Sequence, residues 1–146
     1  MKRTNIILLF TSLLFLGSTC KKEKEDCHKT ITVFNNSEKA IYVSFDTHYP
    51  DTLYFGHYSG ITSNAFANKI LAKSSSDRPL QNKDCWESDF NYGVQIPSDT
   101  IMVYVFDAGV LEKEDWETVV HDYMVLKRYD LSLDDLKRMN WTITYP

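Results

Sequence analysis

The chain has 146 residues and three cysteines, and the first of them, Cys20, stands at a position that predicts its chemistry. Two basic residues and a predominantly apolar run from Ile6 to Leu16 precede it, and the charged segment 21–26 follows it. A run of this length suits a secretory signal peptide and falls short of the ~20 residues that span a bilayer. A cysteine at the cleavage point indicates bacterial lipoprotein processing, in which lipid is attached to the thiol before the leader is cut. We therefore expect a lipoprotein signal peptide at 1–19 and a lipid on Cys20.

If Cys20 carries a lipid, the mature chain keeps two thiols, Cys27 and Cys85, which is an even number. An exported protein matures where disulfides form and persist. We therefore expect a disulfide between Cys27 and Cys85, with two unpaired thiols as the alternative. Closing so long a loop would stabilise the fold by roughly 4 kcal/mol in the chain-entropy model.

Nucleophilic and metal-binding motifs are not evident. The segment from Gly56 to Gly60 nearly forms a nucleophile elbow, but its serine stands one position too late for G-x-S-x-G, and no apolar strand leads into it. The four histidines lack the H-x-H and H-E-x-x-H spacings of metal ligands, so we expect no metal and no cofactor. These histidines are His28, His48, His57 and His121.

Carboxylates are numerous, and a glycosidase would need two of them ~5–9 Å apart across a cleft. Most stand beside turns or at helix starts, where acidic residues are expected for local reasons. A protein that is not an enzyme is the expectation, and a small carboxylate-dependent hydrolase directed at glycans is the alternative.

Aromatic residues make up 14% of the chain, and exposed rings stack on sugars and anchor protein interfaces. Trp116 and Trp141 fall on stripes with Val and Ile, so we expect both to pack in the core. Five aromatics of the irregular region are better candidates for an exposed binding surface, with burial as the alternative. They are Trp86, Tyr49, Tyr54, Phe55 and Tyr58.

Composition places the mature chain among ordinary globular domains. The leader removes two of the 16 basic residues, which leaves 14 against 20 acidic residues and a formal net charge of −6. An acidic surface argues against nucleic acid or anionic lipid held by charge alone. With 43% hydrophobic residues the chain can bury a core, so it is not disordered beyond the charged segment. We expect the lipidated cysteine and a charged tether at 20–26 and a single globular domain at 27–146.

Alternating apolar and polar residues predict several short strands. Thr30–Phe34 and Ala40–Phe45 flank the turn cluster at 35–39, so we expect them to pair as a hairpin. Thr100–Phe106 is apolar on both faces, as in a central strand covered on both sides. The other strands that we expect are 52–55, 125–129 and 141–145.

Two helices are expected late in the chain. An apolar stripe at helical spacing runs from Trp116 to Tyr123. Ser132 and Asp135 resemble a capping box with Asp in the Glu position, opening a short helix through residue 139. The segment 65–71 could be helix or strand. This inventory favours a mainly β, antiparallel β-sandwich-like domain with short connecting helices, and an α+β layer is the alternative.

Two parts of the chain carry a resemblance. Leu126–Leu136 with Asn140–Pro146 resembles the tail of a family of small uncharacterised lipoproteins of gut Bacteroidota, and Phe34–Ser37 with Ile41–Val43 resembles their opening hairpin. The resemblance implies a class and a location, the outer membrane, with the periplasmic or the surface face left open. It brings no activity and no site residues.

The expected function is therefore that of a lipid-anchored binding or interaction module of the cell envelope. Its partners would be the membrane, through the lipid on Cys20, and a glycan or an envelope protein, with no nucleic acid. A structural subunit of an envelope complex is a further alternative.

Overall fold

The computed structural model describes residues 27–51, 61–92 and 95–146. The predicted signal peptide, Cys20, the tether and the strand at 52–55 lie outside the described residues, as do Tyr54, Phe55 and Tyr58. No helix within the described ranges is both long enough and apolar enough to cross a bilayer.

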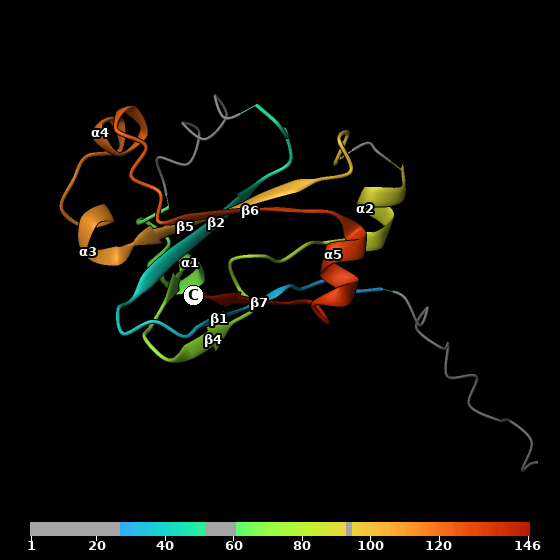
Figure 1. Ribbon diagram of the computed structural model, residues 1–146, viewed down its shortest axis with the longest axis horizontal. Coiled ribbons are helices and arrows are strands. Elements are labelled where there is room, and N and C mark those ends of the chain that lie inside the picture. Colours follow the sequence, from blue (N-terminus) through green and yellow to red (C-terminus); the bar gives the residue numbers. More distant parts are fainter. Residues whose placement is uncertain (1–26, 52–60, 93–94) are drawn as a thin grey trace, which may run out of the picture.

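Seven strands form two sheets within these ranges, and five short helices connect them (Figure 1). The strands are β1 (Thr32–Asn35), β2 (Ile41–Asp46), β3 (Lys69–Ile70), β4 (Ser74–Ser76), β5 (Ile101–Asp107), β6 (Lys127–Leu131) and β7 (Thr142–Tyr145). The helices are α1 (Ala65–Asn68), α2 (Trp86–Tyr92), α3 (Ala108–Leu111), α4 (Trp116–His121) and α5 (Leu133–Arg138). The predicted mainly β class with short helices is confirmed. Helices α2 and α5 lie at one end of the sheets, and α3 and α4 lie at the other (Figure 1).

The larger sheet has the antiparallel order β3-β2-β5-β6. Its strand β5 is buried on both faces from Ile101 to Phe106, as the continuous apolar run predicts. One face carries Val103 and Val105 into the core between the two sheets. The opposite face carries Tyr104 and Phe106 into a second cluster beneath α3 and α4.

The smaller sheet has the order β4-β1-β7, in which β1 and β7 are parallel and β1 and β4 antiparallel. Buried residues of both sheets, such as Val33 of β1, Val43 of β2 and Ile143 of β7, share one apolar core. The two sheets therefore pack face to face. Segment 65–71, left open between helix and strand, contains both, because α1 passes directly into β3.

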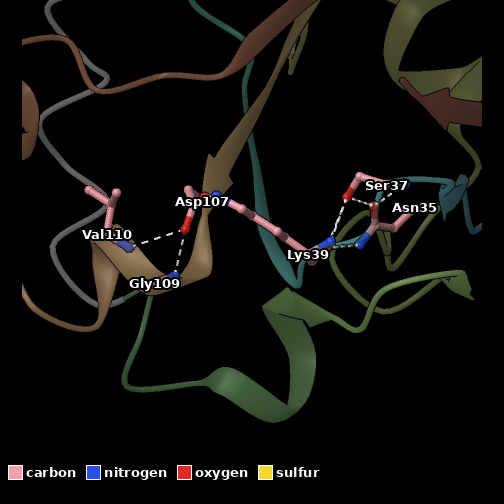
Figure 2. A network of polar contacts seen from close by, with 6 residues as sticks. All are labelled: Asn35, Ser37, Lys39, Asp107, Gly109 and Val110. Carbon is pink, nitrogen blue, oxygen red and sulfur yellow. Dashed lines mark hydrogen bonds and ion pairs between the residues drawn. The ribbon is translucent and has the colours of Figure 1, made fainter.

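The predicted hairpin of β1 and β2 is wrong, since these strands belong to different sheets. The side chain of Asn35, which is fully buried, shows why the chain crosses over (Figure 2). Its Nδ2 donates to the carbonyls of Lys39 at 2.8 Å and Leu71 at 3.0 Å, and its Oδ1 accepts from the backbone N–H of Ser37 at 3.0 Å. The amide thus holds the turn after β1 open and against the β3–β4 connection. In a hairpin, this turn would instead bring β1 and β2 together as paired strands.

The two late helices begin as predicted. Asp115 caps α4 by accepting from the backbone N–H of Thr118 at 2.9 Å. The capping box of Ser132 and Asp135 is present at α5, with the Asp135 carboxylate accepting from the Ser132 backbone N–H at 2.9 Å. Helix α4 ends at His121, two residues before the predicted stripe does, and Tyr123 adopts a left-handed conformation with φ of 49°.

Candidate functional site

Two adjoining hollows lie beside α2. The first, the disulfide hollow, has a volume of about 510 Å³ and is lined by Cys27, Cys85 and Tyr92 among others. The second, the tryptophan hollow, has a volume of about 350 Å³ and is lined by Trp86 among others. The hollows share the side chains of Lys83, Asp84, Asp89 and Gln95. Together they form what we call the α2 groove.

The loop before α2 is held by the first residues of the domain. Leu80 O accepts from Ile31 N at 3.0 Å, and Asn82 N donates to Lys29 O at 2.8 Å. The Asn82 side chain then donates from Nδ2 to Asp89 Oδ2 at 2.6 Å. This bond fixes the carboxylate of Asp89 where the two hollows meet.

The start of α2 is clamped to the same N-terminal segment. Cys27 and Cys85 form a disulfide with a Cα–Cα distance of 4.9 Å, which confirms the predicted pair. Cys85 O also accepts the first helical bonds of α2, from Ser88 N at 3.0 Å and Asp89 N at 3.2 Å. The disulfide therefore ties the helix start to the residue at which the predicted tether would join the domain.

His28 completes the clamp through three contacts. Its carbonyl accepts from Trp86 N at 2.8 Å, and its own N–H and ring both engage Glu87. The ring of His28 stacks on that of Trp141, with centroids 4.1 Å apart and planes inclined by 14°. His28 thus has a structural role, since it joins the N-terminal segment to α2 and to Trp141.

Of the five predicted binding aromatics, the structure describes Trp86 and Tyr49, and these two do not form one exposed surface. Trp86 is only 2% exposed, so the prediction that it lies on the surface is wrong. Its ring packs edge-on against that of Phe45, with the ring centroids 5.4 Å apart. Trp86 and Phe90 are four residues apart on α2, so both point into the core. Tyr49 is 37% exposed but does not line the groove. The expected burial of Trp141 is confirmed, and Trp116 packs half-buried in the second cluster.

Tyr92 is the groove aromatic that the sequence pattern missed. It stands at the end of α2, is 78% exposed and lines the disulfide hollow. The apolar pair Trp86 and Phe90, four residues apart, was the available signal for a helix here. A helix built on that pair places Tyr92 off the buried face.

The groove mixes charged and neutral polar groups. Lys29 and Lys83 supply cations, and Asp84 and Asp89 supply carboxylates. Neutral amides, among them Gln95, supply paired donors and acceptors. No three or more His, Cys, Asp or Glu side chains in the described part of the chain come together in a way that could hold a metal ion.

Several other carboxylates have the local roles expected of them. Asp107 caps α3 through the backbone N–H groups of Gly109 and Val110 (Figure 2). Hydrogen bonds from Ser132, followed by one from Arg138, lower the pKa of Asp135 to about 2. Asp46 is buried and accepts from both the backbone N–H of His48 and its ring Nδ1, each at 2.7 Å. Each of these carboxylates is thus explained by local structure.

No family model, curated protein or solved structure matches this chain. The functional inference therefore rests on the fold and the α2 groove.

Proposed function

We propose that the protein is a lipid-anchored module of the outer membrane that binds a carbohydrate in the α2 groove without transforming it. The observation that carries this proposal is the pair of adjoining hollows beside α2, lined by amides, carboxylates and lysines, with the exposed ring of Tyr92 at their edge.

Carbohydrate is the ligand class whose chemistry fits this lining. Sugar hydroxyls both donate and accept, and the amide of Gln95 and the carboxylates of Asp84 and Asp89 can pair with them. An exposed aromatic ring such as that of Tyr92 offers a flat apolar face to the C–H groups of a sugar ring. A lining so rich in polar groups fits a hydroxylated ligand better than an apolar one.

The place of the groove suits a membrane-bound receptor. Cys27 lies in the wall of the disulfide hollow, and the predicted tether at 21–26 would run from it to the lipid on Cys20. Six residues reach about 20 Å at most when fully extended. An anchored domain would therefore present the groove close to the membrane, among envelope glycans.

Binding is tested with the protein extracted in detergent micelles, first on a glycan array and then by calorimetry. Replacing Tyr92 by Ala is expected to weaken binding about two- to tenfold, because ring stacking is worth about 0.5–1.5 kcal/mol. Phe66→Ala is the matched control, since Phe66 is 77% exposed on the short helix α1 and does not line the groove. Equal binding by the Tyr92 variant and the parent would refute the groove as the site.

The lipid anchor has its own test. Cys20→Ser is expected to abolish incorporation of labelled palmitate and to release the protein from the membrane fraction. A Cys20→Ser protein that remains lipid-labelled would contradict the anchor.

A glycan hydrolase is the second candidate, because Asp84 and Asp89 both line both hollows. Two carboxylates in one groove are what acid-assisted glycoside hydrolysis requires. Release of reducing ends from a bound glycan, lost in both Asp84→Asn and Asp89→Asn, would favour this alternative over simple binding.

A further inference from the structure

The indole N–H of Trp86 is a buried donor that meets no acceptor among the described residues. Trp86 is 2% exposed, and its Nε1 has no hydrogen-bond partner within the described part of the chain. Buried Trp N–H groups usually find a partner. An unsatisfied buried donor destabilises the fold, so an acceptor brought by a ligand would be favoured here.

The tryptophan hollow brings three kinds of group together. Trp86 lines it, the side chains of Phe45 and Ile96 give it an apolar part, and Asp89 adds a carboxylate. Asn82 holds that carboxylate in place through Asp89 Oδ2, at 2.6 Å. The lining of this hollow, about 350 Å³ in volume, therefore combines an indole whose N–H is buried, an apolar surface and a fixed acceptor.

We propose that the tryptophan hollow recognises the acetamido group of an N-acetylated amino sugar. The acetamido carbonyl accepts from the Trp86 N–H, its N–H donates to Asp89, and its methyl group packs on Phe45 and Ile96. A sugar hydroxyl could satisfy the indole but brings no methyl group for the apolar part. This inference rests on the proposed function and specifies the sugar that the groove selects.

Entry of the acetamido group requires a small adjustment of the lining. The Trp86 Nε1 is closed to solvent, and the half-buried ring of Phe45 packs edge-on against the indole with an interplanar angle of 74°. Movement of the side chains around the indole would open the donor. The indole N–H of Trp86 should therefore report binding directly.

Two disaccharides that differ in the acetamido group test the inference. N,N′-diacetylchitobiose and cellobiose share a β-1,4-linked glucose backbone, and only the first carries acetamido groups. Each is titrated into the 15N-labelled protein in detergent micelles, and the three indole N–H signals are assigned with Trp→Phe variants. We expect diacetylchitobiose to bind about tenfold more tightly, which corresponds to about 1.4 kcal/mol, and to shift the Trp86 signal downfield, because it alone supplies an acceptor for the buried indole N–H.

Trp86→Phe is expected to remove this preference, so that the two disaccharides bind within about twofold of each other. If the variant fails to fold, the ligand series decides without it. Chitobiose lacking both acetyl groups should then bind the parent protein about tenfold more weakly than the acetylated form and leave the Trp86 signal unshifted.

The outcomes separate the two proposals. Equal affinity for the two disaccharides with an unmoved Trp86 signal overturns the acetamido inference and leaves carbohydrate binding standing. Binding of other glycans but of neither disaccharide does the same. Binding of no glycan at all overturns both.

Discussion

His28 and Glu87 are joined twice, 59 positions apart in the chain. The backbone N–H of His28 donates to Glu87 Oε2 at 2.9 Å, and His28 Nδ1 lies 2.5 Å from Glu87 Oε1. The Glu87 side chain is only 9% exposed, while that of His28 is 43% exposed. The first residues of the domain therefore hold α2, and with it the groove, through a nearly buried carboxylate.

Glu87→Gln should destabilise the fold by about 1–3 kcal/mol, because the amide cannot accept at both positions and loses the charge-assisted bond. Urea unfolding measures the change. Glu38→Gln is the control: Glu38 pairs with Lys73 but its side chain is 83% exposed, so a loss under about 1 kcal/mol is expected. Equal losses in the two variants would show that the clamp is not important for stability.

Replacing both Cys27 and Cys85 by Ser should lower the free energy of unfolding by about 2–4 kcal/mol, since the disulfide closes a separation of 58 residues. The same variant should bind the groove ligand more weakly, because both cysteines line the disulfide hollow. Urea unfolding and calorimetry measure the two effects. Full affinity in a folded double variant would show that the disulfide is not needed to shape the groove.

Asn35→Ala should lower the free energy of unfolding by about 2–3 kcal/mol. It removes the buried amide that donates to the carbonyls of Lys39, Ile70 and Leu71. Thermal unfolding followed by circular dichroism measures this loss. Asn36→Ala is the matched control, since Asn36 is the exposed neighbour in the same turn. A stability loss no larger than that of the control would contradict the role of Asn35 in joining the sheets.

Ser132→Ala should destabilise the fold by about 1 kcal/mol through loss of the α5 cap. Urea unfolding at neutral pH checks this value. Ser98→Ala is a suitable comparison, because Ser98 is a half-buried loop serine whose hydroxyl donates to the Thr100 carbonyl at 3.3 Å. A cost at Ser132 no greater than at Ser98 would mean that the capping box contributes little.

Asp135 makes the same cap dependent on pH. Its folded pKa of about 2 lies below the ordinary value of 3.8, so its stabilising effect is complete above about pH 4 and is lost as the pH falls toward 2. The stability difference between the parent and Asp135→Asn should therefore shrink over this range. Urea midpoints at several pH values measure it, and a difference independent of pH would contradict the shift.

Local patterns predicted many of the elements but not their neighbours. The apolar run at Ile101–Phe106 correctly predicted a doubly covered strand, because continuous apolar residues need cover on both faces. The alternation in β1 and β2 correctly predicted strands but wrongly predicted their pairing. Alternation specifies which face is buried and leaves the partner strand open, and here β1 pairs with β4 and β7.

The candidate site was only partly predictable for a related reason. The sequence makes Trp86 a candidate for exposure, yet it is buried with its ring against Phe45, whereas Tyr92 is exposed and was not among the candidates. Exposure depends on how α2 docks on the sheets. That docking is set by contacts with residues far away in the chain, His28 above all.

By itself the sequence predicted the class of fold and the capping box at Ser132, because both depend on residue type and short spacing. It predicted the pairing of Cys27 with Cys85 on the expectation that Cys20 carries a lipid. The tertiary structure alone decided that β1 runs parallel to β7 and that the α2 groove exists. The groove needs residues from the domain start, the loop before α2 and the end of β2 to meet, and only the long-range packing of the two sheets brings them together.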